Sequence, residues 1–519
     1  MKYTRSKVIA TVTALALVAA ACGKDRGSSA SSTTAAPATT IAATAAPATT
    51  AANTGASTAD STPGTTGATT APTEATGATT APTETTAAPT TAVPAGPMFG
   101  DAPWPCGPAA SANKDDGSEV GVTADAVTIS GGDDAGYAGA PGLDHEATDA
   151  IKALVAKCNE LGGINGRQIK YNYFDAGVFN VGVAMQSACD AKSFFLVGDA
   201  WSFNGNQEET RLGCGLPAVP TFAVSAAFSM GKDVYQGSPN PADETPAGYF
   251  ATMTKLQPDA VKKIATLAAN FSATTEPRDK TVAASPAFGW GFAGANLLYN
   301  PVGEADWTPF VKQVQQAGAS AVYFVGTCLP GFQLFAQAAK ANGLNIPMLA
   351  DTNFYEAACA AANTDGAMDG MYLHLSYMPF EDAAVNPATK DYIDLVKANG
   401  GDISLLGAQA TSSFLLWATA ASACGDTLTR ACTLTNLANT HSWTGHGLHS
   451  AADPGGNHPP SCNITLQLEG TKYVRVSPTK AGTYDCDPSW IAPVVGVPAL
   501  AAAKLDANRI SQQFAVAGG

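Results

Sequence analysis

The sequence predicts an α/β fold in which two lobes, each a doubly wound parallel sheet, follow a targeting segment and a disordered stalk. Strand-like and helix-like stretches alternate from residue 121 onward, and parallel strands need such crossover helices. The alternation begins again near residue 259, as a second sheet requires. The 519 residues are enough to bury two cores after a long tail.

Residues 1–21 have the pattern of an export signal. Basic residues at the start precede an apolar stretch that is too short to span a bilayer. Small residues then lead to Cys22, in a run (Leu-Val-Ala-Ala-Ala-Cys-Gly) that resembles a bacterial lipobox. We therefore expect Cys22 to be lipidated and to hold the chain on the extracytoplasmic face of the cell membrane. A cleaved signal peptide with an unrelated cysteine is the alternative.

Residues 22–97 are predicted to form a disordered stalk. From residue 28 this stretch is almost entirely Thr, Ala, Pro, Ser and Gly, with near-repeats of Gly-Ala-Thr-Thr-Ala-Pro-Thr-Glu. Such a composition buries too little apolar surface to offset the entropy of ordering the chain. The stalk would hold the folded part away from the membrane.

The first lobe begins with a strand–loop–helix–strand unit. Residues 126–130 read as a strand, and residues 168–175 as the next one. Between them, apolar side chains recur at helical spacing at Ile151, Leu154, Val155 and Cys158. Gly162 and Gly163 then favour a helix stop, because glycine adopts the left-handed conformation of a C-cap without a steric penalty.

Further elements follow from the same patterns. In the first lobe we expect strands at 193–198 and 218–224 and a helix beginning at 207–213. In the second lobe we expect helices at 259–270, 307–317 and 329–342, and strands at 280–284, 321–326 and 347–350. Later come helices at 389–399 and 408–424 and strands at 463–468 and 472–476.

Ten of the eleven cysteines remain when Cys22 is set aside, and an even number in an exported chain predicts five disulfides. The sequence does not determine their connectivity. Proximity along the chain favours the pairs Cys424–Cys432, Cys462–Cys486, Cys328–Cys359 and Cys189–Cys214, which leaves Cys106 and Cys158. A metal site is the alternative, but the chain has no Cys-x-x-Cys.

Two short runs resemble the type I periplasmic-binding-protein family, and within it the branched-chain-amino-acid-type substrate-binding proteins of ABC importers. They are Gly-Val-Thr at 121–123 and Asn-Glu-Leu-Gly-Gly-Ile-Asn-Gly-Arg at 159–167. The resemblance extends loosely from residue 121 to 487. It implies two lobes with a cleft between them and three crossings of the chain. The implied ranges are 98–245 with 380–440 for lobe 1, 246–379 with about 455–490 for lobe 2, and a C-terminal tail at 491–519.

Candidate ligand residues lie in loops after strands, because ligands of open parallel sheets bind beyond the carboxyl ends of the strands. Those expected in lobe 1 are Tyr137, Trp201, Ser202, Ser225 and Ala226; those in lobe 2 are Ser285, Thr327, Asp351 and Asn353. The family resemblance implies that hydroxyls such as those of Ser202 and Ser225 hold a ligand carboxylate. It also implies that an acidic residue in lobe 2, here Asp351, holds an ammonium group. Asp351 as a simple helix N-cap is the alternative.

The sequence therefore predicts a monomeric extracytoplasmic solute-binding protein without cofactor or catalysis. It would close on a small polar solute, an amino acid or a related amide or acid, and deliver it to the permease of an ABC importer. The net charge of −15 and the lack of a basic run argue against nucleic-acid binding.

Two alternatives come from other classes of protein. A ligand-sensing receptor module would have the same fold and the same cleft. A secreted metal-dependent hydrolase would use the histidine-rich loop at 441–458, with His441, His446, His449 and His458. Residues 289–294 match a dinucleotide fingerprint by letter, but no clear helix and no suitably spaced acidic residue follow.

Overall fold

The computed structural model describes residues 96–114 and 117–514, all of which belong to the compact unit Thr90–Gly519. The targeting segment, Cys22 and nearly all of the expected stalk lie outside the described residues. Within the described part, none of the helices combines the length and apolar character needed to cross a bilayer.

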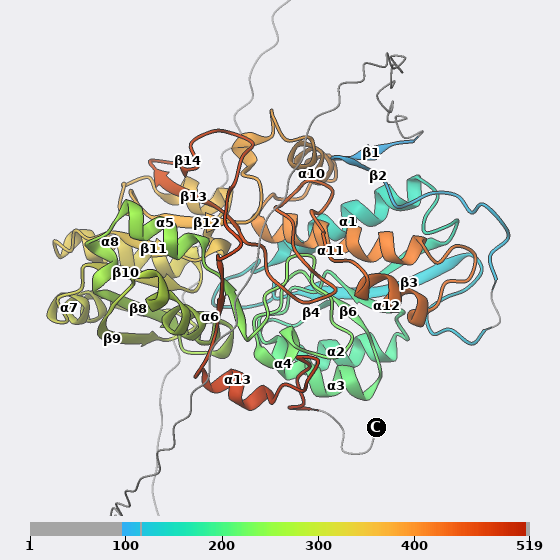
Figure 1. Cartoon of the computed structure of the whole chain (residues 1–519), viewed down its shortest axis with the longest axis horizontal. Coiled ribbons are helices and arrows are strands. Elements are labelled where there is room, and N and C mark those ends of the chain that lie inside the picture. Colours follow the sequence, from blue (N-terminus) through green and yellow to red (C-terminus); the bar gives the residue numbers. More distant parts are fainter. Residues whose placement is uncertain (1–95, 115–116, 515–519) are drawn as a thin grey trace, which may run out of the picture. The chain divides into compact units, whose positions relative to one another are not determined.

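Lobe 1 is built on a four-stranded parallel sheet with the order β4–β3–β5–β6 (Figure 1). Its strands are β3 (Ala126–Asp133), β4 (Gln168–Asp175), β5 (Phe195–Val197) and β6 (Ala218–Val219). The helices grouped around it are α1 (His145–Glu160), α2 (Val181–Asp190), α3 (Glu208–Gly213), α4 (Ala226–Ser229), α10 (Pro387–Ala398), α11 (Leu405–Ser422) and α12 (Arg430–Ala438).

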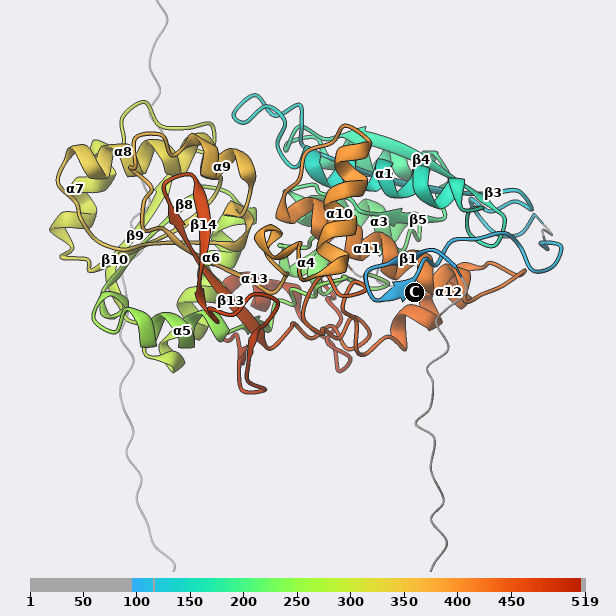
Figure 2. The same cartoon turned by 90° about the horizontal axis from the view of Figure 1, so that it is seen from above.

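Helices cover both faces of this sheet. On β5, Phe195 packs in the same apolar cluster as Leu154 of α1 and Leu415 of α11. The next residue, Leu196, faces the other way and packs with Met185 of α2. Helix α11 lies beside α1 although the two are far apart in the sequence (Figures 1 and 2). The late helices expected from the sequence therefore complete lobe 1.

The expected stop of α1 is confirmed in detail. The helix ends at Glu160, and Gly162 and Gly163 follow with φ of 115° and 78°. A Cβ on Gly163 would lie 2.0 Å from the backbone oxygen of Arg167, so only glycine fits this tight return into β4.

Lobe 2 contains an eight-stranded sheet whose main path is β14–β13–β12–β11–β10–β8–β9, with β15 paired to β13. Its strands are β8 (Ile264–Ala269), β9 (Phe292–Tyr299), β10 (Ala321–Val325), β11 (Met348–Ala350), β12 (Tyr372–Leu375), β13 (Cys462–Glu469), β14 (Lys472–Ser477) and β15 (Asp485–Cys486). Neighbouring strands are parallel from β9 to β12, whereas β13 and β14 are antiparallel additions. The helices are α5 (Gly248–Leu256), α6 (Ser272–Ala284), α7 (Thr308–Gln316), α8 (Gln333–Ala341) and α9 (Ala357–Ala362).

Two predictions at the start of lobe 2 are wrong. The helix expected at 259–270 contains strand β8, whose six residues are all buried. A strand that is covered on both faces shows no alternation of apolar and polar residues. Its continuous apolar run therefore cannot be distinguished from that of a buried helix. The strand expected at 280–284 is the last part of α6 instead. The fingerprint-like residues 289–294 lead into β9, not into a helix.

The expected strand at 218–224 is shorter than predicted. It ends at Val219, because the following Pro220 has no N–H to contribute to a sheet. The residues after it run as a loop into α4, and this moves Ser225 away from the end of the strand.

The segment after residue 490 contacts both lobes, and we call residues 491–511 the C-terminal strap. Its strand β16 (Ile491–Pro493) pairs with β7 (Glu244–Pro246), and α13 (Pro498–Ala503) follows. Val494 packs in the lobe 2 cluster, whereas Ala503 packs against Ala226 and Met230 of lobe 1. The Arg509 guanidinium is bonded to both carboxylate oxygens of Asp243, at 2.8 and 2.7 Å.

Four disulfides pair as proximity along the chain favoured, and the two cysteines that this left, Cys106 and Cys158, form the fifth. The five bonds are Cys106–Cys158, Cys189–Cys214, Cys328–Cys359, Cys424–Cys432 and Cys462–Cys486. Strands β1 (Met98–Phe99) and β2 (Ala102–Pro103) form a small hairpin. The Cys106–Cys158 bond links the segment after this hairpin to α1.

We expect the disulfides to differ in how much they stabilise the fold. The Cys106–Cys158 bond spans 52 residues and Cys424–Cys432 spans eight. Restricting a longer loop removes more entropy from the unfolded chain, by about 4 against about 2.5 kcal/mol. Urea unfolding of the double variants C106A/C158A and C424A/C432A measures this difference. An equal or larger loss in the second variant would contradict it.

Candidate functional site

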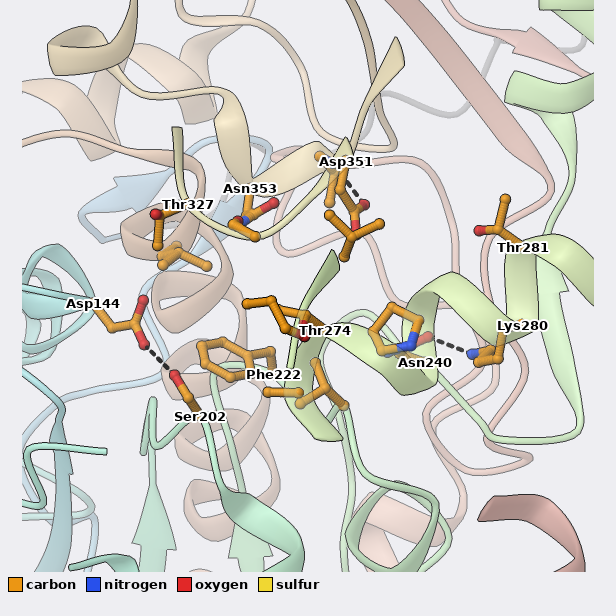
Figure 3. A pocket seen from close by; sticks show the side chains of 18 of the residues that line it. Asp144, Ser202, Phe222, Asn240, Thr274, Lys280, Thr281, Thr327, Asp351 and Asn353 are labelled. Atoms are coloured by element: carbon orange, nitrogen blue, oxygen red, sulfur yellow. Dashed lines mark hydrogen bonds between the residues drawn. The ribbon is translucent and has the colours of Figure 1, made fainter. Parts of the chain in front are cut away.

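A cavity of about 280 Å³ lies where loops of both lobes meet (Figure 3). Lobe 1 lines it with residues that include Tyr137, Asp144, Ser202 and Phe222, and lobe 2 with residues that include Thr274, Lys280, Tyr323, Thr327, Asp351 and Asn353. Aromatic and aliphatic side chains make up much of the wall, and hydroxyl, amide and charged side chains make up much of the rest. This is the composition of a site for a small organic molecule.

Five of the nine ligand residues predicted from the sequence line this cavity. They are Tyr137, Ser202, Thr327, Asp351 and Asn353. They come together because each follows the carboxyl end of a parallel strand in its own lobe. Their contact with a solute stays a prediction.

The other four predicted residues do not line the cavity. Trp201 is fully buried and donates its indole N–H to the backbone oxygen of Phe174. Ser225 caps α4, where its hydroxyl accepts the N–H of Phe228.

The N–H of Ala226 donates to Glu276 of lobe 2 at 2.8 Å, next to the cavity and not in its wall. Ser285 follows a helix instead of the predicted strand and is completely buried. Ser285 was expected at the cavity because residues 280–284 were predicted to form a strand, whereas they form the end of α6.

The lobe 1 side of the cavity has an acidic corner. The Asp134 carboxylate is buried and accepts the N–H groups of Val178 and Ser202, each at 2.7 Å. The Ser202 hydroxyl in turn donates to Asp144 at 3.1 Å. Burial, together with neighbouring carboxylates, raises the pKa of Asp144 well above its usual value.

On the lobe 2 side, Asp351 lies beside basic and hydrogen-bonding groups. The imidazole of His374 lies 3.7 Å from its carboxylate, and the N–H of Thr352 donates to it at 2.7 Å. Burial alone would raise the pKa of Asp351, but His374, Thr352 and the charge of Lys280 together lower it. Asp351 is therefore an ionised and largely compensated carboxylate.

Lys280 is a cavity residue that the sequence reasoning missed. Its ammonium donates to the side-chain oxygen of Asn240 at 2.7 Å and to the backbone oxygen of Pro241 at 2.6 Å (Figure 3). Burial lowers the pKa of Lys280 to about 8. It lies within α6, which the sequence pattern suggested to be a strand, so its position gave no signal of a site.

Both lobes contact each other beside the cavity. The Tyr137 hydroxyl of lobe 1 donates to the backbone oxygen of Pro301 in lobe 2 at 2.9 Å. The rings of Phe203 and Phe271 lie 5.2 Å apart between centroids and make a second contact of the same kind. These contacts exist only when the lobes are close together.

Hydrogen bonds occupy both ring nitrogens of His449. Its Nδ1 lies 2.8 Å from the backbone oxygen of Ser450 and therefore donates. Its Nε2 then accepts from the hydroxyl of Ser412, which itself accepts the indole N–H of Trp443. This arrangement leaves no lone pair for a metal ion.

The other histidines of the loop have separate surroundings. His441 pairs with Asp453 at 2.8 Å, and His458 with Glu244 at 2.7 Å. Burial lowers the pKa of His446. Among residues 96–114 and 117–514, one trio of ligand-type side chains comes close together: Cys328, Glu356 and Cys359, whose two sulfurs form a disulfide. The hydrolase alternative therefore gains no metal site from the loop.

A family model described as periplasmic binding protein matches residues 133–472. The chain belongs to the periplasmic binding protein family. None of the curated proteins compared with it matches.

Solved structures with the same fold come from several solute-binding proteins. A fatty acid ABC transporter substrate-binding protein from Thermomonospora curvata is 15% identical, with a TM-score of 0.55 over 70% of this chain and 97% of its own. The branched-chain amino acid transporter substrate binding protein LivJ from Streptococcus pneumoniae, in complex with isoleucine, is 14% identical, with a TM-score of 0.54 over 68% and 100%. A solute binding protein from R. palustris in complex with benzoate is 16% identical, with a TM-score of 0.55 over 70% and 98%. At this identity the similarity shows the fold alone.

Acid should destabilise the protein through His449. Burial lowers its pKa to about 4, below the value near 6.5 expected in the unfolded chain. The stability due to the neutral ring is complete above pH 6.5 and is lost as the pH falls toward 4, by up to ~3 kcal/mol.

Unfolding free energies measured from pH 7.5 to 4 in wild type and H449Q test this. The variant should show a shallower decline with falling pH. The exposed His441 provides the matched control, and H441Q should keep the wild-type slope. Parallel curves for wild type and H449Q would contradict the expectation.

Proposed function

We propose that this periplasmic binding protein captures one small polar solute between its two lobes and delivers it to the permease of an ABC importer. The observation that supports this most directly is the cavity, whose wall is shared between loops at the carboxyl ends of both sheets. A solute held there would contact both lobes at once, so binding and lobe closure would be coupled.

The wall favours an amino acid or a related amide or acid. Aromatic and aliphatic residues such as Phe222, Phe250 and Val325 offer apolar contact, while Ser202, Thr327 and Asn353 offer hydrogen bonds. The isoleucine and benzoate complexes of similar proteins are of matching size class and polarity. No bond needs to be made or broken in this function.

The proposal also includes where in the cell envelope the protein acts. Lipidation of Cys22 would anchor the chain outside the cytoplasmic membrane, and the tract to residue 97 would give the folded part its reach. The protein would act as a monomer beside its permease.

A thermal-shift screen against a library of small metabolites tests the proposal. A solute at one hundred times its dissociation constant should add roughly 2.7 kcal/mol of stability. Solution scattering with the same solute should show a more compact particle. Turnover of a bound solute, or no shift across a broad panel of amino acids and organic acids, would overturn the proposal.

Removal of the Tyr137 hydroxyl should weaken solute binding without weakening the fold. In Y137F the bond to Pro301 is lost, and with it a link between the two lobes beside the cavity. One neutral hydrogen bond contributes about 0.5–1.5 kcal/mol, so the dissociation constant should rise about 2–10-fold.

Y392F is the matched control for this experiment. Tyr392 donates to the backbone oxygen of Ser404, and both residues belong to lobe 1. This variant should lower the unfolding free energy and leave the dissociation constant unchanged, by calorimetry. Equal effects of the two variants on affinity would contradict the role given to Tyr137.

A further inference from the structure

Asp144 is a buried carboxylate that faces the cavity. Only 8% of the residue is exposed, and it stands at the N-cap of α1 with a left-handed φ of 63°. Its side chain makes no capping bond to its own helix. Its Oδ2 instead accepts the hydroxyl of Ser202, at the edge of the cavity (Figure 3).

After burial, the largest charge effects on Asp144 come from other carboxylates. They belong to Asp134, Glu146 and Asp133, and each of them raises the pKa of Asp144 in addition to burial. The nearest basic ring on the same helix, His145, is bonded to Asp133 at 2.8 Å. Among the described residues, Asp144 forms no ion pair that would offset the cost of its burial.

The other charged residues of the cavity wall compensate one another. They are Asp351, Lys280 and His374, all from lobe 2. Asp351 faces both basic groups, which lower its pKa. Asp351, the residue that the sequence suggested as partner of an ammonium group, is therefore already stabilised by basic side chains, whereas the strongest charges on Asp144 are negative.

A second acceptor belongs to the lobe 1 wall of the cavity. Gln409 in α11 lines the cavity, and its side-chain oxygen is buried without a hydrogen-bond partner among the described residues. The first turns of α1 and α11 are adjacent, since a Cβ on Gly407 would lie 3.1 Å from the backbone oxygen of Glu146. A carboxylate bonded to one hydroxyl and an amide oxygen without a donor, both in the lobe 1 wall, suit a group that only donates.

We infer that the solute carries a protonated amine that ion-pairs with Asp144 of lobe 1, with Gln409 as a second acceptor. This inference rests on the proposed function and specifies the solute class. The cationic end of the solute then faces lobe 1, opposite to the orientation predicted from the sequence. A charge-assisted bond to a buried carboxylate should change affinity by about 10–100-fold.

Paired probes test the inference with the full-length protein. Straight-chain and branched alkylamines of three to six carbons, and benzylamine, are compared by calorimetry with the carboxylates of the same shape, such as benzylamine against benzoate. Amines should bind more tightly than their matched carboxylates. In D144N the dissociation constants of the amines should rise at least tenfold. Carboxylates that bind more tightly than amines, or the absence of amine binding, would overturn the inference.

E160Q is the matched control. Glu160 ends the same helix, and its exposed ion pair with Lys157 lies on the surface, so the variant loses the same charge far from the cavity. Amine affinities should stay at the wild-type value in E160Q. An equal loss in both variants would assign the effect to net charge and overturn the inference.

Two further readouts separate binding from a structural role. Wild-type amine affinity should rise with pH as Asp144 ionises, and this dependence should vanish in D144N. The melting temperature of D144N without solute should equal or exceed that of wild type, because an uncompensated buried charge is removed. A lower melting temperature together with a retained pH dependence would show that Asp144 acts on the fold alone.

The inference and the proposed function fail differently. A metabolite that shifts the melting temperature and carries no cationic group would overturn the role of Asp144. It would leave the capture of a solute between the lobes intact.

Discussion

The carboxylate of Asp134 fixes the loops on the lobe 1 side of the cavity through hydrogen bonds. It is fully buried at the carboxyl end of the first sheet and accepts one backbone N–H from the loop after β4 and one from the loop after β5. The first of these donors belongs to Val178, a β-branched residue at a φ of 69°, which is costly without a compensating bond. The second fixes Ser202 and thereby the Asp144 carboxylate. Three loops of the cavity wall therefore depend on one acidic side chain.

Much of lobe 1 could be predicted from the sequence because the local patterns of its residues agree with the elements that the folded lobe contains. Strand β4 matches its expected range of 168–175, and the glycine pair after α1 marks the stop that the backbone needs. Four disulfide pairs followed proximity along the chain, and the fifth followed by elimination. Lobe 2 was harder, since β8 is buried on both faces and shows no alternation, and Thr281 and Val282 in α6 favour strands as isolated residues.

The same reasoning explains which site residues were missed. Residues directly after parallel strands, such as Thr327 and Asp351, were found because topology alone places them at the cavity. Asp144 and Lys280 belong to helices, and neither spacing nor residue type separates them from surface charges. Their significance comes from burial and from their partners, which depend on how α1, α6 and α11 pack. A sequence pattern does not contain that information.

The C-terminal strap has a mechanical consequence. It is paired to β7, packed in the cores of both lobes and bonded through Arg509 to Asp243. A rotation of one lobe against the other must bend the strap or detach one of its anchors. Its attachment to both lobes therefore contributes to the energy of such a rotation, although none of its residues lines the cavity. Substitutions there would retune apparent affinity while every atom that touches the solute stays the same.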